Sequence, residues 1–530
     1  GQLTTRADAD LNSYLIATLN HDRTVTFLNP SVTSISRMES AVELKANGFD
    51  WVYAPALGRI FITMPEASAV AVIDSVTEKF VADIALEKSS KPGRLALAPD
   101  GRSVWVSLDG ASKAAVIDGS NLSVRGYAPA GRGIHAIAFS PDGKRVWIAN
   151  SQANSVSVID AGSLASIATV AVDSTPVTIV WMPAAAMVYV ASLNGETISA
   201  IHPDTNQVAA RISAGRGVTA LGVDPEGRFL IAVNQLQSRI TSIDTATNRV
   251  VTTVAVELEP DQIVFTNRFA YVRSLDSDKF TLIELKDLRS GTAKALTIQG
   301  GRHKPSEEAG QVTGAAMIAP TPEGNSVLVA NAPDAVLYFY EEGLMAPKGT
   351  FDNYRRKPRG VLIVDRSLQQ MGKGVFSGPV RVAASGRFDV PVVIDQPKLH
   401  MCFEASLEGS ATQALASTRL LRLVAIDEPK NVAERERIHV KFRIEDARSG
   451  APASGFRAVQ MLAFQPPGQW QDRQWLKESG DGIYEGWQAF PHAGRYVLQV
   501  NVLEPGVRLD SHPLYIRADV STAPATAGQP

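Results

Sequence analysis

An all-β fold in two regions is predicted by three observations along the 530 residues. Short apolar strands recur about every 42 residues as far as Asp365. Many of them follow a turn made of Pro, an acidic residue and Gly. Beyond Asp365 this pattern stops, and a different alternating pattern appears twice. We therefore expect a repeated unit followed by a separate all-β region.

The repeated turn is made of residues whose backbone preferences fit it. Pro presets φ at the first corner, the acidic side chain caps the turn, and Gly takes the corner with positive φ. The strong copies are PDGRSVWVS from Pro99, PDGKRVWIA from Pro141, PEGRFLIAV from Pro225 and PEGNSVLVA from Pro322. Each copy predicts a strand.

A further strand follows each turn and ends at a regular position. These ends are Asn29, Asp74, Asp118, Asp160, His202, Asp244 and Glu284. A period near 42 with several alternating strands and two turn signals is typical of a four-stranded propeller blade. The first region is thus predicted to be a β-propeller.

These residues resemble the YVTN family of bacterial β-propellers and, more distantly, the propellers that bind haem d1 in bacterial denitrifiers. The resemblance covers about residues 11–368. It implies the fold but no function, because propellers serve many unrelated roles.

Seven or eight blades are expected, and we favour eight. Counting the N-terminal copy TVTFLN and the copy at residues 336–340 gives eight units. The N-terminal strands and the late strand RGVLIVD, which ends at Asp365, would then complete one blade together. Such closure leaves no sheet edge exposed at the seam.

The segment 338–360 is longer than the other connections, and we expect an ordered loop. It is either a clasp, partly buried against the propeller and the second region, or a surface for a partner, because aromatics and arginines are common at interfaces. Its candidate partner-binding residues are Phe339, Tyr340, Met345, Phe351, Tyr354, Arg355 and Arg356, with the two arginines outward.

Residues 372–394 and 480–502 align with each other, so that Gly374 matches Gly482 and Phe376 matches Tyr484. Each has an aromatic strand, a Gly-Arg-aromatic turn and alternating apolar residues, as a half-buried antiparallel strand would. The Gly-Arg-Tyr turn that ends at Tyr496 resembles the corner of immunoglobulin-like sandwiches. We expect an all-β region of one and a half sandwich units or of two small ones.

Composition excludes several classes of protein. The chain is 45% hydrophobic and 20% charged, as globular proteins are. Its net charge of -2 gives no sign of nucleic-acid or membrane-surface binding, and no stretch approaches the roughly 20 apolar residues that span a bilayer. Cys402 is the only cysteine, which excludes an intramolecular disulfide.

These patterns divide the chain into an N-terminal arm (1–10), the propeller (11–368), the immunoglobulin-like region (369–520) and a disordered tail (521–530). The tail is rich in Ala, Thr, Pro and Gly. The chain starts at Gly1 without an initiator Met, as a processed secreted chain or a cut tag would. We expect a periplasmic or extracellular protein.

Positive side chains cluster where the innermost strands of the propeller are expected to begin, at one mouth of its channel. These candidate ligand-binding residues are Lys91, Arg94, Arg132, His135, Arg216, Arg302 and His303, with Lys304 beside them. A mouth with one sign of charge would concentrate a small anionic ligand. The alternative is that they are ordinary loop residues with solvated tips.

Four histidine and cysteine positions have distinct interpretations. His135 is placed as a haem or metal ligand would be, although such a His is more often a hydrogen-bonding loop residue. His202 replaces the Asp that ends this strand in other blades, and we expect it to keep the turn hydrogen bond. His400 and Cys402 share one face of a strand and are soft ligands of the kind that hold copper. The alternative for Cys402 is buried packing.

Two functions are weighed, because no enzyme motif is found and no catalytic residue is assigned. The first is a non-catalytic extracytoplasmic binding and assembly protein, whose propeller binds a ligand or partner and whose sandwich region docks it to another extracytoplasmic protein. The second is a redox or cofactor-handling subunit of a periplasmic dehydrogenase or oxidoreductase system, with a haem d1-like group, a quinone or copper.

Overall fold

The computed structural model of the chain describes residues 14–30, 37–133, 136–275, 277–301, 314–372, 374–378, 386–394, 399–407, 419–426, 432–456, 459–465, 470–502, 507–509 and 514–521. Two compact units divide the chain, one within Asn12–Arg381 and the other within Val382–Pro530. The predicted arm at 1–10 lies outside the described residues, as does the predicted tail 521–530 except Ser521, which ends a strand.

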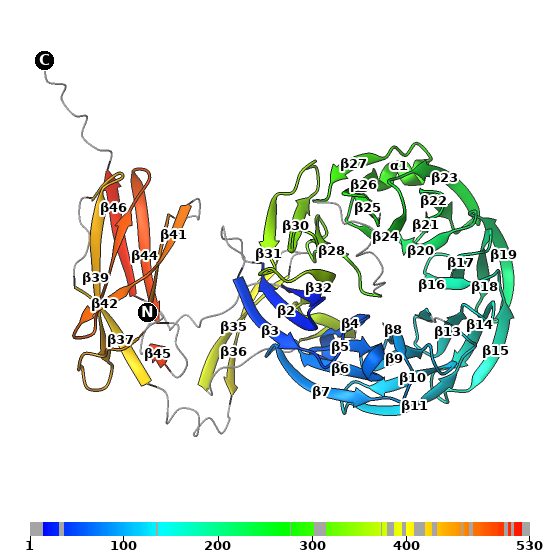
Figure 1. Cartoon of the computed structure of the whole chain (residues 1–530), viewed down its shortest axis with the longest axis horizontal. Coiled ribbons are helices and arrows are strands. Elements are labelled where there is room, and N and C mark those ends of the chain that lie inside the picture. The colour runs from blue at the N-terminus through cyan, green and yellow to red at the C-terminus, as the bar shows by residue number, and fades with distance from the viewer. Residues whose placement is uncertain are drawn as a thin grey trace, which may run out of the picture. The chain divides into compact units, whose positions relative to one another are not determined.

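The described residues of the first unit form eight four-stranded antiparallel sheets, arranged as blades around a ring (Figure 1). The predicted propeller is confirmed, and the described blades number eight. In blades 2 to 8 the strands follow chain order from the innermost to the outermost. Every blade therefore starts its innermost strand on the same side of the ring.

The strands of the eight blades have the following bounds. Blade 1 is β32 (Pro358–Asp365), β1 (Tyr14–Asn20), β2 (Thr24–Asn29) and β3 (Arg37–Glu43); blade 2 is β4 (Trp51–Ala54), β5 (Arg59–Met64), β6 (Ala69–Asp74) and β7 (Lys79–Ala85), with 3-10 turns η1 (Pro55–Leu57) and η2 (Pro65–Ala67). Blade 3 is β8 (Pro92–Leu97), β9 (Ser103–Leu108), β10 (Lys113–Asp118) and β11 (Ser123–Pro129); blade 4 is β12 (Ile137–Phe139), β13 (Arg145–Asn150), β14 (Ser155–Asp160) and β15 (Ser166–Ala171). Blade 5 is β16 (Pro176–Met182), β17 (Met187–Ser192), β18 (Thr197–His202) and β19 (Gln207–Ser213); blade 6 is β20 (Val218–Val223), β21 (Phe229–Asn234), β22 (Arg239–Asp244) and β23 (Arg249–Ala255). Blade 7 is β24 (Pro260–Phe265), β25 (Phe269–Ser274), β26 (Lys279–Glu284) and β27 (Leu296–Gln299); blade 8 is β28 (Ile318–Pro320), β29 (Ser326–Asn331), β30 (Val336–Glu341) and β31 (Gly349–Asp352).

Turn chemistry explains why each blade folds as the repeat predicts. Gly101 and Gly143, in two Pro-acid-Gly turns, have φ of 67° and 69°, the left-handed conformation that Gly adopts without strain. At the end of β6, Asp74 Oδ1 accepts hydrogen bonds from the N–H of Val76 (3.0 Å) and Thr77 (2.7 Å). His202 Nδ1 accepts the N–H of Asp204 at 3.2 Å, which confirms that it keeps the turn bond.

Blade 1 closes the ring with strands from both ends of the propeller. β1 pairs with β2 on one side and with β32 on the other, both antiparallel. The predicted strand exchange is thus confirmed. The two strands of the seam are hydrogen-bonded like any other pair of a blade, so neither leaves an unpaired edge there.

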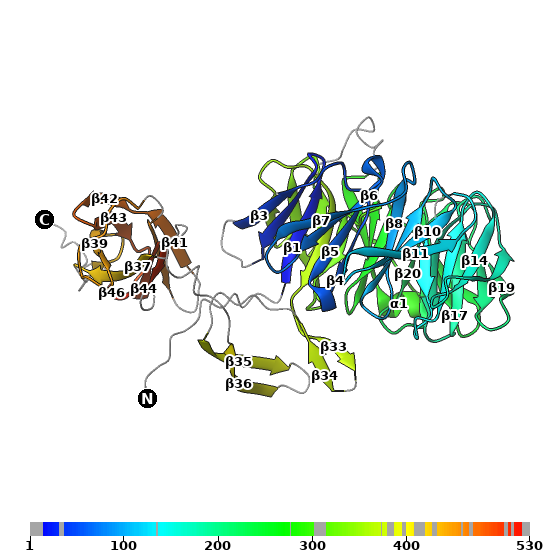
Figure 2. The same ribbon diagram turned by 90° about the horizontal axis from the view of Figure 1, so that it is seen from below.

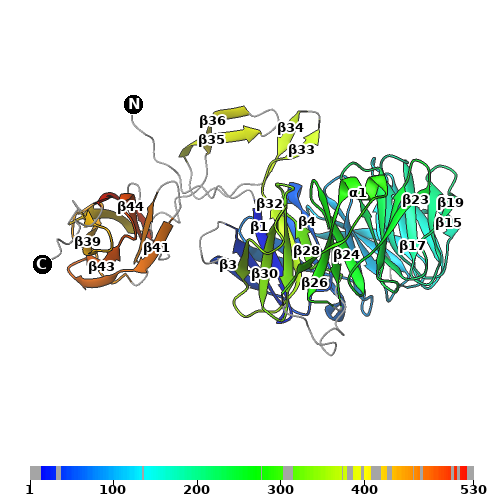
Figure 3. The same cartoon turned by 90° about the horizontal axis from the view of Figure 1, so that it is seen from above.

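The core of the ring lies between neighbouring blades. One cluster joins Leu15 and Phe27 of blade 1 to Ile60 and Ile62 of blade 2, and similar clusters follow around the ring. The short helix α1 (Leu285–Ser290) follows β26 and packs beside β23 (Figure 3). Its Leu285 and Leu288 are buried.

The segment 338–360 is not the single long loop that we expected. Its residues complete β30, form β31 as the outermost strand of blade 8, and begin β32. Tyr340 is fully buried and meets Phe280 of blade 7 edge-to-face at 4.8 Å. Phe351 packs edge-to-face on Phe339 at 6.1 Å. Most of the predicted interface aromatics are therefore propeller core.

The second unit contains a β-sandwich of two five-stranded sheets. One sheet has the order β42 (Lys477–Gly480), β43 (Ile483–Ala489), β39 (Arg437–Asp446), β37 (Arg419–Ala425) and β45 (Val507–Leu509). The other has the order β38 (Val432–Ala433), β46 (Leu514–Ser521), β44 (Gly494–Val502), β40 (Val459–Gln465) and β41 (Trp470–Trp475).

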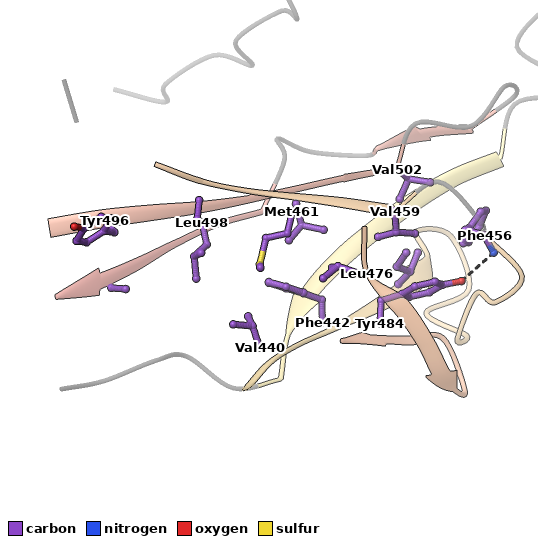
Figure 4. Packing of buried hydrophobic residues seen from close by; sticks show 14 of the residues in the cluster. Val440, Phe442, Phe456, Val459, Met461, Leu476, Tyr484, Tyr496, Leu498 and Val502 are labelled. Carbon is purple, nitrogen blue, oxygen red and sulfur yellow. Dashed lines mark hydrogen bonds between the residues drawn. The ribbon is translucent and has the colours of Figure 1, made fainter. Parts of the chain in front are cut away.

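Side chains of both sheets form one core between them (Figure 4). Phe442 and Tyr484 of the first sheet pack with Met461 and Leu498 of the second. The Tyr496 hydroxyl donates to the backbone carbonyl of His492 at 2.9 Å. This is the contact that a tyrosine corner makes at the start of a strand in immunoglobulin-like sandwiches.

The alignment of residues 372–394 with 480–502 is visible in the backbone. The hairpin of β33 (Gln369–Gly372) and β34 (Val375–Ser377) pairs Gln370 with Phe376, as β42–β43 pairs Glu478 with Tyr484. The bounds of β35 (Gly386–Ile394) are the residues that align with the bounds of β44, and β35 pairs with β36 (Leu399–Leu407). Each hairpin is a separate two-stranded sheet in the described residues (Figure 2). In the residues that the structure describes, the first copy of the repeat thus forms two hairpins, whereas the second copy is part of two five-stranded sheets.

Candidate functional site

The candidate site is the rim of the propeller, which we define as the residues at and just before the starts of the eight innermost strands. In five blades the ladder between the innermost strand and its neighbour shifts register there. The bulged residues are Gly93 and Arg94 (blade 3), Val177 (blade 5), Thr219 (blade 6), Asp261 (blade 7) and Arg359 (blade 1). Bulges redirect side chains and are frequent beside functional sites.

Four of the predicted basic residues are placed at this rim. Lys91, Arg132 and Arg216 are exposed, just before the innermost strands of blades 3, 4 and 6. Lys91 also lines a shallow depression of about 500 Å³ together with Glu66 and Lys88. Arg94 is half-buried within β8. His135, Arg302, His303 and Lys304 lie outside the described residues.

Arg94 is engaged with blade 2 and with the segment before β28. Its Nη1 donates to the carbonyl of Gly314 at 2.6 Å. Asp50, just before β4, lies beside it and accepts the N–H of Trp51 (2.9 Å) and of Leu95 (3.1 Å). The described rim thus carries buried carboxylates as well as arginines, so its charge is of both signs.

Residues 314–317 connect four blades across this part of the rim. The N–H of Gly314 donates to the carbonyl of Phe49 in front of blade 2 at 2.8 Å. The carbonyl of Ala316 accepts the N–H of Val361 in blade 1 at 2.7 Å. The N–H of Met317 donates to Gln262 Oε1 of blade 7 at 2.8 Å. This segment therefore ties the start of blade 8 to its neighbours.

Asp50 gives the rim a pH-dependent contribution to stability. Burial raises the pKa of its carboxyl above the ordinary value, although Arg94 and the N–H groups of Leu95 and Trp51 favour the charged form. A raised pKa means that the folded state binds the proton more tightly than the unfolded chain. The stabilisation from Asp50 is then complete below its unfolded pKa and is lost as pH rises through the folded pKa.

We expect Asp50→Asn to gain stability relative to the unsubstituted protein as pH rises from about 4 to 7. Urea unfolding followed by tryptophan fluorescence at several pH values would measure the difference between the two proteins. Asp74→Asn is a control, because this carboxylate lies in an exposed turn. A difference that is constant with pH would contradict the assignment.

Asp261 in blade 7 is a bulged residue that has its own counter-charge. It forms an ion pair with Arg273, which stands on the neighbouring strand β25 beside the register shift. Burial raises the pKa of Asp261, and Arg273 opposes that rise. The pair shows how the fold neutralises a charge at this position.

Arg359 in blade 1 occupies the same bulged position without such a partner. Only 6% of its surface is exposed. Among the described residues its guanidinium makes neither a hydrogen bond nor an ion pair, and Nε is buried without a partner. Burial lowers its pKa, which Glu66 only partly offsets. An unpaired charge in such a place is costly to the fold.

Sequence reasoning missed Asp50, Asp261 and Arg359. One signal was available for two of them, because the innermost strands of blades 1, 3, 5 and 7 begin with Pro. Aligning the Pro residues places Arg359 and Asp261 at equivalent positions. Their burial, however, depends on strand pairing that no local pattern reveals.

The remaining predicted residues are dispersed over the molecule. Met345 and Tyr354 are exposed, and the Tyr354 hydroxyl accepts the N–H of Met38 at 3.3 Å. Arg355 is exposed, and Arg356 Nε lies 3.3 Å from Asp22 Oδ2. Both arginines are on the propeller, in the connection between β31 and β32.

The proposed metal pair lies on the hairpin β35–β36. Cys402 is exposed, so it is not the buried packing residue of the alternative interpretation. The side chain of His400 lies outside the described ones. In the part of the chain that the structure describes, no group of three His, Cys, Asp or Glu side chains is arranged as metal ligands would be.

An aromatic platform on the sandwich was not predicted. Trp487 of β43 is half exposed and stacks on His439 of β39, with ring centroids 4.6 Å apart and planes at 13°. The Arg437 guanidinium lies 5.6 Å from the Trp487 ring, and Glu485 Oε2 lies 3.3 Å from His439 Nε2. Exposed Trp and Arg of this kind are frequent at protein interfaces.

No family model matches the sequence, and no curated protein matches it. Among solved structures, the dihydro-haem d1 dehydrogenase NirN in complex with DHE is 17% identical with a TM-score of 0.53, over 68% of this chain and 76% of that one. Apo AztD from Citrobacter koseri is 13% identical with a TM-score of 0.51, over 69% and 98%. Kuenenia stuttgartiensis hydrazine synthase is 20% identical with a TM-score of 0.39, over 48% and 77%. The first two of these structures support the propeller fold.

Among the described residues, no helix is long and apolar enough to cross a membrane.

Proposed function

We propose that this chain is a non-catalytic extracytoplasmic binding and assembly protein. Its propeller holds a ligand or partner, and its C-terminal region, which we take to be immunoglobulin-like, docks it onto another extracytoplasmic protein. We call the hairpins β33–β34 and β35–β36 together the half-sandwich, and we place the docking surface on the apolar face of β35–β36, which carries Val390 and Phe403.

One observation carries this proposal, namely that core positions of the sandwich are exposed in the half-sandwich. Tyr484 is fully buried, whereas its equivalent Phe376 is 52% exposed. Leu498 is fully buried, whereas its equivalent Val390 is 39% exposed. Phe403, opposite Val390, is 54% exposed. A two-stranded hairpin with an apolar face is not stable by itself in water, so this face needs a cover.

The chemistry of the cover follows from the complete copy. There, β39 pairs antiparallel with β43, and β40 pairs antiparallel with β44. A protein that supplies a strand with alternating apolar residues would fill the corresponding position beside β35.

The test is co-purification of the full chain from its own host. We expect one partner in stoichiometric amount, which is lost from Val390→Asp and Phe403→Asp. Phe80→Asp is the matched control, because Phe80 is 46% exposed on the outermost strand of blade 2. A monomeric chain without a partner, or equal loss from all three variants, would contradict the proposal. Self-association that depends on Phe403 would replace the foreign partner by a second copy.

A cofactor-handling role is the second candidate. The NirN structure, which has this fold, holds a ligand named DHE. The visible absorption spectrum of protein from its own host separates the two candidates. A colourless protein that binds no added haem, and is unchanged by His135→Ala, removes this alternative.

A further inference from the structure

We propose that Arg359 is the anchoring residue for a small oxyanion, a carboxylate or a phosphate group, at the rim of the propeller. This inference rests on the ligand-binding part of the proposed function and names the chemical class of the ligand. It does not depend on the half-sandwich or its partner.

Two equivalent bulges, in blades 7 and 1, differ in the residue that faces them. In blade 7 the bulge between Pro260 and Gln262 contains Asp261, and the residue paired with Gln262 is Arg273. In blade 1 the bulge between Pro358 and Gly360 contains Arg359, and the residue paired with Gly360 is Leu19. Arg273 thus neutralises Asp261 in an ion pair. Leu19 is apolar and can form neither an ion pair nor a hydrogen bond with the Arg359 guanidinium.

A second observation concerns the groups around Arg359. The backbone on both sides is engaged, since the carbonyl of Lys357 accepts the N–H of His21 (3.0 Å) and the N–H of Val361 donates to the carbonyl of Ala316 (2.7 Å). Glu66 acts on Arg359 without reaching ion-pair distance. Among the described residues these backbone groups are paired with one another, and Arg359 Nε is left without a partner.

The guanidinium of Arg359 has the chemistry of an oxyanion-binding group. It presents N–H donors in a planar fork that matches the two oxygens of a carboxylate or of a phosphate. It cannot escape burial by losing its proton. An anion would supply both the charge and the acceptors that the described residues do not offer, and such charge-assisted bonds are the strong ones.

Two other bulges of the rim, in blades 6 and 7, also carry polar side chains. Thr219 in blade 6 and Asp261 in blade 7 each have a buried side-chain oxygen, Oγ1 and Oδ1, without a hydrogen-bond partner in the described structure. Three bulged residues of the rim thus keep unused polar atoms. Of these side chains, the Thr219 hydroxyl can donate to an anion, whereas an ionised Asp261 carboxylate can only accept.

The experiment measures the thermal transition of the full chain, without any partner, at fixed ionic strength. Inorganic phosphate and succinate are added separately at millimolar concentration. We expect one or both to raise the transition of the unsubstituted protein by about 2 °C or more. Phosphate alone or succinate alone would show which oxyanion the site takes.

Variants decide whether Arg359 is the anchor. Arg359→Met should abolish the rise and, without an anion, should raise the transition itself, because an unpaired buried charge has been removed. Arg359→Lys should keep the charge but weaken binding at least tenfold by calorimetry. Arg249→Met, at an exposed arginine on the outermost strand of blade 6, should behave like the unsubstituted protein.

Three outcomes would overturn the inference. The first is no rise with either anion, and the second is an equal rise in Arg359→Met, which means an adventitious ion effect. The third is full binding by Arg359→Lys and by Arg359→Met. Because no partner is present, each of these failures leaves the docking proposal standing.

Discussion

Asn353→Ala is expected to loosen the closure of the ring more than any other polar substitution in the propeller. Asn353 is fully buried in the connection between β31 and β32. Its Oδ1 accepts the hydroxyls of Thr18 (3.0 Å) and Thr26 (2.8 Å), and its Nδ2 donates to Asn20 Oδ1 (2.8 Å). The substitution would leave several buried groups unpaired at once, which costs about 2–4 kcal/mol.

The reason for this effect is the place of the network in the ring. In blade 4, Asn150 at the end of β13 accepts the N–H of Gly131 (2.8 Å) from the connection to its own blade. Asn20 makes the corresponding bond in blade 1, but its connection comes from the far end of the propeller. Loss of Asn353 therefore weakens the junction of β1 with β32, which come from opposite ends of the propeller. In the other blades the four strands are consecutive in the chain.

Hydrogen exchange of the intact chain would localise the change. We expect faster exchange in β1, β2 and β32 for Asn353→Ala, with little change in blades 4 to 6. Asn150→Ala is the matched control and should loosen blade 4 alone. A lock at the seam would be contradicted by uniform exchange over the ring, or by a stability within about 0.5 kcal/mol of the unsubstituted protein, as for an ordinary surface substitution.

Tyr484→Ala is expected to unfold the sandwich, whereas Phe376→Ala at the equivalent position should leave the free chain unchanged. Tyr484 fills the core, donates to Glu478 Oε2 (3.1 Å) and accepts the N–H of Phe456 (2.9 Å). Removing a buried aromatic ring costs about 3–5 kcal/mol. Phe376 is half exposed. The free energy of unfolding of Phe376→Ala should therefore lie within about 0.5 kcal/mol of that of the unsubstituted protein.

Urea unfolding can follow the sandwich through its own tryptophans, Trp470, Trp475 and Trp487. The four others belong to the propeller, so replacing Trp487 by Phe in each protein assigns the transition. Comparable losses from both substitutions would mean that the half-sandwich is already packed in the free chain. The docking proposal would then lose its main observation.

Much of the propeller could be predicted from the sequence because its signals are local. The strands that end at Asp74, Asp118 and Asp160 end there because each Asp caps the turn that follows. The Pro-acid-Gly turns set the start of the strand that directly follows each turn, such as β9 after Pro99 and β13 after Pro141. Ring closure was also within reach, since RGVLIVD reads as a strand without a repeat of its own.

The site was harder to predict because it depends on contacts between distant residues. The bulge that holds Arg359 exists only in the register of β32 against β1. β31 was taken for a loop, since GTFD is short and has no clear alternation. The alignment of residues 372–394 with 480–502 was visible, but the sequence could not show that the described residues of the first copy form separate hairpins and not a closed sandwich.

The seam in blade 1 also sets an order of events during synthesis. Asn353 follows Asn20 by 333 residues. At roughly 5–20 residues per second, a ribosome needs on the order of 20–60 s to make that stretch. Throughout this time β1 has one edge without its final partner, and an unpaired edge invites wrong pairing. During synthesis, the free edge of β1 must therefore be kept from pairing with other strands until β32 has been made.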